Sequence, residues 1–254
     1  MSYELNVIAE WFVTNRLALN IKKTCIVPFF VRKPLQLPLI YVSNSIIPCV
    51  SYTKFLGIII DSQLNWTNHV NFICNKLSQC VYMLRVCANC IPLCIRRLMY
   101  FAFAQSYLTN GIECWSNTNE TNLNRITVLQ KRLIRYMCNL HHLSHCAPYA
   151  ANNKILFVRD LYYLSLSNLA FKIFNKLPIP DCIKCMFQTP NYVYDTRAIN
   201  FNFVSYNSKL NIRRFSCIVN CIFIWNSLSH ELRAIPTLCL FKYRLKSNLF
   251  LEYH

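Results

Sequence analysis

The side chains best suited to metal-dependent chemistry in this sequence, the carboxylates, are few and scattered. The chain of 254 residues has only 10 of them, and no two are adjacent. They are Glu4, Glu10, Asp61, Glu113, Glu120, Asp160, Asp181, Asp195, Glu231 and Glu252. Phosphoryl transfer by two metal ions needs clustered carboxylates that hold the cations about 4 Å apart. The sequence contains no local pair for this task, although residues distant in the chain can still converge in space.

Cysteine and histidine occur at spacings typical of metal sites. The pairs Cys87/Cys90 and Cys182/Cys185 each have the spacing of half a zinc site, and His141–Cys146 would be another half. A chain with 15 Cys contains such pairs by chance, and an odd number cannot pair completely. We therefore predict reduced cysteines that serve as packing residues and no bound metal. Cys182 and Cys185 leave a zinc-stabilised module open as an alternative.

Cationic side chains are abundant and concentrated on one predicted helix. Lys and Arg number 27, and the net charge of +17 favours an anionic partner, which is nucleic acid ahead of an anionic membrane surface. Over 122–140 the pattern predicts a helix whose apolar stripe consists of Leu123, Ile126, Leu129, Leu133, Ile134 and Met137. The opposite side carries Arg125, Lys131, Arg132 and Arg135. A solvated helix face is the simpler interpretation, but no acid at helical spacing neutralises these cations, which favours contact with phosphates.

Other cations form smaller clusters. These are Arg96-Arg97, Arg213-Arg214 and Lys242/Arg244/Lys246.

The elements that must position these side chains are strands in the first quarter and helices afterwards. A helix is predicted from Glu4 to about Asn20, and proline-broken runs over 25–30, 37–42 and 45–50 predict edge or hairpin strands. The run 54–61 predicts a better strand. Helical patterns follow over 66–87, 92–108, 122–140, 157–175, 213–227 and 238–250. The predicted fold class is α+β, mostly α.

Composition and the length of the apolar runs indicate the cellular compartment in which the protein is expected. Hydrophobic residues make up 54% of the chain, which indicates an extensive core. The run 217–225 is about half as long as a membrane span requires, and the first residues read as an amphipathic helix and not as a signal peptide. We expect an intracellular protein, nuclear or cytoplasmic, without membrane spans.

Gly57 lies within the predicted strand of "KFLGIIIDSQLNW" and is one of only two glycines in the chain. A glycine inside a strand weakens it unless another backbone or a ligand approaches closely. A β-bulge or a tight joint without any ligand is the other interpretation. At the end of the strand, Asp61 or Ser62 is expected to cap the turn into the next helix.

Several stretches together resemble reverse transcriptases of non-LTR (LINE-type, jockey-like) retrotransposons. "WFVTNRLALNIKKTCIVPF" is similar to the segment that follows the catalytic aspartates there, with matches at Leu17, Leu19, Asn20, Lys23 and Thr24. "KFLGIIIDSQLNWTNHV" resembles the primer-grip hairpin and the beginning of the thumb, with matches at Phe55, Leu56, Gly57, Asp61, Leu64, Trp66 and His69. "LQKRLIRYM" and "WNSLSHELRAIPTLCLFKYRLK" look like the helical region downstream.

The resemblance implies a division into three parts. Residues 1–63 would be the end of a polymerase palm with its primer-grip hairpin, 64–176 a helical thumb-like region, and 177–254 a Pro-interrupted linker with a C-terminal helical region. Lys54, Phe55, Leu56 and Gly57 would support the primer, and the cations of 125–135 would clamp the backbone of a primer–template. Lys23 would lie near the incoming triphosphate as a proton donor to the leaving pyrophosphate, a role that needs a complete active site.

The resemblance also implies what this part of the enzyme would not do. In the family, the paired aspartates that bind Mg²⁺ lie before the first matching helix, so the chain would be a fragment of an RNA-directed DNA polymerase without catalysis of its own. It would bind no cofactor itself, and its partners would be an RNA/DNA primer–template and the missing upstream polymerase part. The alternative is a non-catalytic basic helical module that binds RNA or a protein partner.

Overall fold

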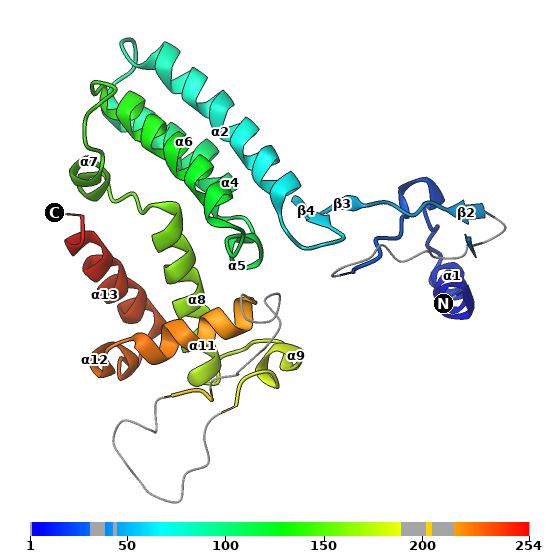
Figure 1. Ribbon diagram of the computed structural model, residues 1–254. Helices are drawn as coiled ribbons and strands as arrows, with labels where there is room; N and C mark the ends of the chain where they lie inside the picture. The colour runs from blue at the N-terminus through cyan, green and yellow to red at the C-terminus, as the bar shows by residue number, and fades with distance from the viewer. Residues whose placement is uncertain (1, 31–38, 43–44, 189–201, 205–215, 254) are drawn as a thin grey trace, which may run out of the picture. The chain divides into compact units, whose positions relative to one another are not determined.

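The computed structural model describes residues 2–30, 39–42, 45–188, 202–204 and 216–253. The chain divides into two compact units, Met1–Val70 and Asn71–His254. The described part is mostly α-helical and contains two small antiparallel sheets, so the fold class α+β, mostly α, is confirmed (Figure 1). None of the helices in these residues is long and apolar enough to cross a membrane.

The first unit has a helix, a single 3₁₀ turn and two hairpins. Its elements are α1 (Ser2–Thr14), η1 (Ile21–Lys23), β1 (Ile40–Val42), β2 (Ser45–Ile47), β3 (Tyr52–Phe55) and β4 (Ile58–Asp61). Strands β1 and β2 pair antiparallel, with Ile40 opposite Ile47, which confirms a hairpin there. Residues 37–38 of the predicted strand lie outside the described residues. The predicted strand over 25–30 is wrong: it makes one isolated bridge at Ile26, and Pro28, which has no N–H, cannot extend the pairing.

The first helix ends earlier than the sequence pattern predicts. Helix α1 ends at Thr14 and not near Asn20. Arg16 takes a left-handed conformation with φ of 56°, and the N–H of Leu17 donates to the carbonyl of Phe12 at 2.8 Å. Such a left-handed residue after the last turn is a common helix stop, because it satisfies the terminal carbonyls. The apolar spacing alone did not contain this signal.

The second unit is helical. Helix α2 (Thr67–Cys87) begins in the first unit, and the remaining elements are α3 (Leu93–Met99), the π-helical turn η2 (Tyr100–Gln105), α4 (Ser106–Thr109), α5 (Ile112–Trp115), α6 (Glu120–Cys138), α7 (Ala147–Asn152), α8 (Val158–Phe174), α9 (Asp181–Lys184), α11 (Cys217–Ser227), α12 (His230–Arg233) and α13 (Leu238–Leu251). Within this unit α2 and α6 run side by side (Figure 1). The predicted helices over 66–87, 122–140, 157–175 and 238–250 are confirmed. Of the helix predicted over 213–227, residues 213–215 lie outside the described residues, and α11 begins at Cys217 and ends at Ser227 as predicted.

An aromatic cluster joins α8, α11 and α13. The rings of Phe171 and Phe241 stack with centroids 4.6 Å apart, and Trp225 lies edge-on to Phe171 at 6.4 Å. All three side chains are essentially buried. Aromatic pairs at these distances add to the free energy of burial, so the cluster holds the three helices as one packed group.

Helix α6 is fixed from its buried side by one polar residue. The predicted apolar stripe is confirmed at Leu123, Ile126, Leu133, Ile134 and Met137, which are all buried. The prediction for Leu129 is wrong, because Leu129 is only half-buried and Gln130 is fully buried in its place. The amide nitrogen of Gln130 donates to the Tyr100 hydroxyl and to the Leu156 carbonyl, and its oxygen accepts the Val158 N–H, each at 2.9 Å.

Gln130 thus ties α6 to η2 and to the start of α8. A buried amide is tolerated when its hydrogen bonds are made inside the protein, and here both ends of the amide are bonded. This network sets the position of α6, whose other side carries the cations.

Candidate nucleic-acid interface

The hairpin of β3 and β4 places the primer-grip candidates at its tip. Phe55 pairs with Ile58, so Leu56 and Gly57 form a two-residue turn. Gly57 has φ of 87° and Leu56 has φ of 48°. The prediction that Gly57 lies inside a continuous strand is therefore wrong: it occupies a turn position that requires positive φ, where glycine has no steric penalty.

The hairpin tip is apolar and open to solvent. The side chain of Phe55 is 60% exposed and that of Leu56 is 81% exposed, and Lys54 is exposed as well. A leucine in the left-handed region costs roughly 1–2 kcal/mol. The first unit therefore holds an unfavourable residue at the tip without any gain from burying it.

The carboxylate of Asp61 accepts hydrogen bonds from backbone N–H groups and so stabilises the turn into α2. Its Oδ1 accepts the N–H groups of Gln63 and Asn65, each at 3.1 Å, and its Oδ2 accepts the N–H of Trp66 at 2.9 Å. The carboxylate is buried, with 6% exposed. The expected cap is therefore confirmed, and Asp61 supplies it.

His69, in the first turn of α2, completes the support of the second hairpin. Its Nδ1 accepts the N–H of Ile59 on β4 at 3.3 Å. Burial disfavours the charged imidazolium and lowers the pKa of His69 to about 4. His69 is therefore neutral at physiological pH, in the state that can accept a hydrogen bond.

The 3₁₀ turn η1 carries Lys23 at its end. The side-chain oxygen of Asn20 accepts the N–H of Lys23 at 3.2 Å and so caps this turn. The Lys23 side chain is exposed. Two of the residues on which the family resemblance rests, Asn20 and Lys23, thus meet in one local turn.

The four cations predicted on one side of α6 lie on two different surfaces. Arg125 and Arg132 line hollows toward α2, whereas Lys131 lines a separate hollow toward α8 and α13. Arg135 borders both sides, and its Nε donates to the Ser144 carbonyl at 3.1 Å. Arg135 therefore fixes the loop after α6 in addition to any contact with a ligand.

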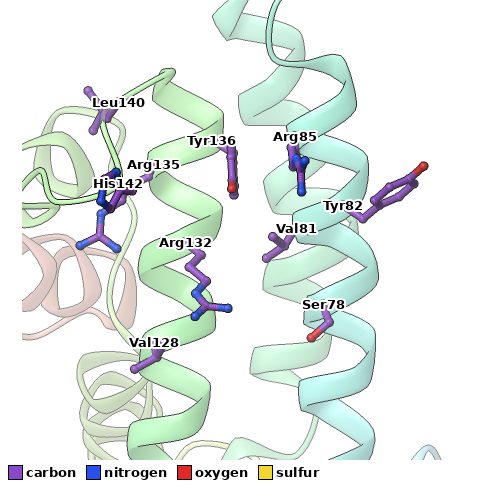
Figure 2. A pocket seen from close by; sticks show the side chains of 10 residues that line it. All are labelled: Ser78, Val81, Tyr82, Arg85, Val128, Arg132, Arg135, Tyr136, Leu140 and His142. Carbon is purple, nitrogen blue, oxygen red and sulfur yellow. The ribbon is translucent and has the colours of Figure 1, made fainter.

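A groove between α2 and α6 brings the arginines together. We name this the α2–α6 groove; it consists of two adjoining hollows of about 580 and 640 Å³ that share Ser78, Val128 and Arg132. Figure 2 shows the first hollow, with Arg132 of α6 and Arg85 of α2 reaching into the space between the two helices. Its cations are Arg85, Arg125, Arg132 and Arg135, and none of the described residues that line either hollow is Asp or Glu.

Arg85 was missed by the sequence reasoning. It follows Ser78 and Tyr82 at intervals of four and three residues, so all three lie on one face of α2. The signal for Arg85 in the sequence is this polar face, opposite the apolar stripe of α2. Neither of the ion pairs Arg159–Glu120 and Lys184–Asp181 involves a groove arginine.

The other cationic clusters differ in their structural roles. Arg96 is 8% exposed, and its Nη1 donates to the Tyr136 carbonyl in the last turn of α6 at 3.2 Å. The Nε of Arg97 donates to the Asn153 carbonyl at 3.0 Å. These two arginines therefore brace helix and loop ends. Arg213-Arg214 lies outside the described residues, and Lys242/Arg244/Lys246 lies on α13.

Most of the described carboxylates have a partner within the protein. Besides Asp61, Glu120 pairs with Arg159, Asp181 with Lys184, Glu113 accepts the Ser165 hydroxyl, and Asp160 accepts the Tyr253 hydroxyl. No group of three or more His, Cys, Asp or Glu side chains that could hold a metal ion occurs among the described residues. The residues described here thus do not fit the Mg²⁺ pair of a polymerase.

The cysteines are free thiols throughout. Cys182 and Cys185 lie on or directly after α9, both exposed, and the Cys185 thiol donates to the Cys182 carbonyl at 3.2 Å. Burial raises the pKa of Cys221, and it raises that of Cys217 to about 12, so these two stay protonated thiols within the α8–α11 packing.

Comparison with models of known protein families, with curated proteins and with solved structures finds no match. The resemblance to non-LTR reverse transcriptases stays a prediction from the residues named above.

Proposed function

We propose that this chain is the palm–thumb part of a non-LTR retrotransposon reverse transcriptase and that it binds an RNA–DNA primer–template through the phosphate backbone. The observation that carries the proposal is the α2–α6 groove, which Arg85, Arg125, Arg132 and Arg135 line, with no Asp or Glu among the described residues of its lining. Guanidinium groups bind phosphates in bidentate geometry, and a cluster without acids gains most from an anionic ligand.

The order of the elements supports the same proposal. A helix and short hairpins precede the long helices, as the palm end and thumb of such an enzyme require. The hairpin tip offers Lys54, Phe55, Leu56 and Gly57 to a ligand as exposed or turn residues. An exposed leucine with a strained backbone is typical of positions kept for contact and not for stability.

The proposal assigns binding and not chemistry to this chain. The described carboxylates form no metal-holding group, and five of them are used in structural contacts. The paired aspartates would belong to an upstream polymerase part, and a frame that encodes an aromatic-x-Asp-Asp sequence upstream of this chain in the genome would support that origin. Template-dependent incorporation of deoxynucleotides by the purified chain with Mg²⁺ would contradict it.

The binding proposal is tested by titrating the purified chain with labelled RNA–DNA duplexes of unrelated sequence. We expect similar affinity for all of them, because phosphate contacts carry no sequence information. The Arg85→Ala/Arg125→Ala/Arg132→Ala variant should weaken binding to every duplex alike. Equal binding by the parent and a folded triple variant would contradict the proposal.

A second candidate function has one observation in its favour. Val81, Val128 and Leu140 also line the groove, and an apolar floor with cationic edges fits an acidic amphipathic helix of a protein partner. Competition decides between the two: an acidic helical peptide that binds the groove where duplexes do not would favour the interaction module.

A further inference from the structure

We infer that the α2–α6 groove holds a single-stranded stretch of RNA or DNA whose bases enter it, with Tyr136 as the stacking surface. The inference rests on the proposed function and deepens it, since it names which part of a primer–template this groove takes. It follows from the shape of the groove, from its arginines and from the uncharged polar groups on its walls.

The aromatic ring lies where a base could reach it. Tyr136 projects from α6 into the space between the two helices, beside Arg132 and across from Arg85 and Val81 (Figure 2). It is half-buried. A ring flanked by guanidinium groups can stack on a base while the arginines contact the adjoining phosphates, which is how single strands are bound without sequence preference.

The second hollow adds groups suited to base edges. Its lining includes Asn75 and Ser78 of α2 and Thr121 and Asn124 of α6. Amides and hydroxyls both donate and accept hydrogen bonds, as the exposed edges of unpaired bases require. An amphipathic protein helix would place its apolar face against these amides and hydroxyls, so their presence favours the nucleic acid.

The arginines are spread along the groove. Arg125 and Arg132 are separated by seven residues of α6, which corresponds to about 10 Å along the helix axis. Arg85 adds a guanidinium from the other wall. A duplex can offer phosphates to these edges, but its paired bases cannot enter, whereas a single strand supplies phosphates and bases together.

The test compares strands with and without bases. Fluorescence polarisation would measure the affinity of the full chain for a short single-stranded RNA of mixed sequence and for an abasic sugar–phosphate strand of the same length. We expect the RNA to bind about tenfold more tightly than the abasic strand, because each stacked base contributes on this order. Tyr136→Ala should abolish the difference, and Tyr136→Phe should retain it because the ring remains.

Tyr243 on α13 provides the matched control, since it is exposed and outside the groove. Tyr243→Ala should leave the difference unchanged, and circular dichroism should show equal folding of all variants. Equal binding of RNA and abasic strand by the parent, or a difference that survives Tyr136→Ala, would overturn the inference. So would an acidic helical peptide that binds the groove when the RNA does not.

The outcomes separate this inference from the proposed function. If duplex binding depends on the groove arginines while the bases contribute nothing, the inference fails and the phosphate-binding function stands. If the chain binds neither duplex nor single strand, both fail.

Discussion

The buried amide of Gln130 offers the sharpest test of how α6 is positioned. Replacing it by methionine, Gln130→Met, keeps a similar shape and removes every polar atom of the side chain. The Tyr100 hydroxyl, the Leu156 carbonyl and the Val158 N–H then lose their partner in a site that is 0% exposed at Gln130. Each lost hydrogen bond costs about 1 kcal/mol, and a buried group left unsatisfied costs about 1–3 kcal/mol.

Summed over three groups and reduced for the apolar gain of methionine, the expected loss is about 3 kcal/mol in the free energy of unfolding. Urea denaturation followed by far-ultraviolet circular dichroism measures it under reducing conditions. Leu129→Ala is the matched control on the neighbouring position: Leu129 is half-buried, so its loss should be about 1 kcal/mol, well below that of a core leucine. A smaller loss in the free energy of unfolding for Gln130→Met than for Leu129→Ala would refute the stabilising role of the Gln130 hydrogen bonds. It would favour the interpretation that the apolar stripe alone positions α6.

Three further predictions concern the first unit. Asp61→Ala should lower the free energy of unfolding by about 3 kcal/mol, because three backbone N–H groups lose their acceptor. Asp61→Asn should lower this free energy less, since one oxygen remains. Equal stability of the parent and both variants in urea would contradict the cap. The pKa of His69 is about 4 in the folded state and 6.5 ordinarily, so the unfolded chain binds this proton more readily. The free energy of unfolding is therefore full above pH 6.5 and falls toward pH 4 by up to about 3 kcal/mol. A His69→Gln variant should lack this pH dependence, and an unchanged pH dependence in that variant would exclude His69 as its source. Leu56→Asn should raise thermal stability, by about 1 kcal/mol, because asparagine tolerates positive φ, and a lower melting temperature would contradict the turn geometry.

Helical periodicity predicted most of the second unit, because the apolar stripe of a long helix repeats over many residues. The bounds of α8 and α13 agree with the prediction to within one residue. The strand prediction over 54–61 failed at Gly57 because a two-residue turn of Leu-Gly differs from the usual Asn-Gly, so the turn was hidden inside an apolar run. Gln130 was missed because its burial depends on partners 26 to 30 residues away, which no local pattern contains.

The candidate site was predicted in part. Arg125 and Arg132 lie in the groove, but helical spacing could not show that Lys131 faces another hollow. The spacing of Ser78, Tyr82 and Arg85 assigns Arg85 to a polar face of α2, but only the packing of α2 beside α6 shows that it lines the same hollow as Arg132. Sequence patterns assign residues to helix faces, whereas the partner of each face is a property of packing.

The salt dependence of duplex binding tests the central claim most directly. For the parent chain, the logarithm of the association constant should fall linearly with the logarithm of salt concentration, because phosphate contacts release counterions. Arg85→Ala/Arg125→Ala/Arg132→Ala should make that slope shallower by about 0.9 per lost contact, or about 2.7 in all, with the B-DNA value as a guide. The matched control Lys242→Ala/Arg244→Ala/Lys246→Ala removes the same charge from α13 and should leave the slope as it is. An unchanged slope in a folded groove variant, or an equal change in the α13 control, would contradict the assignment of the α2–α6 groove to nucleic acid.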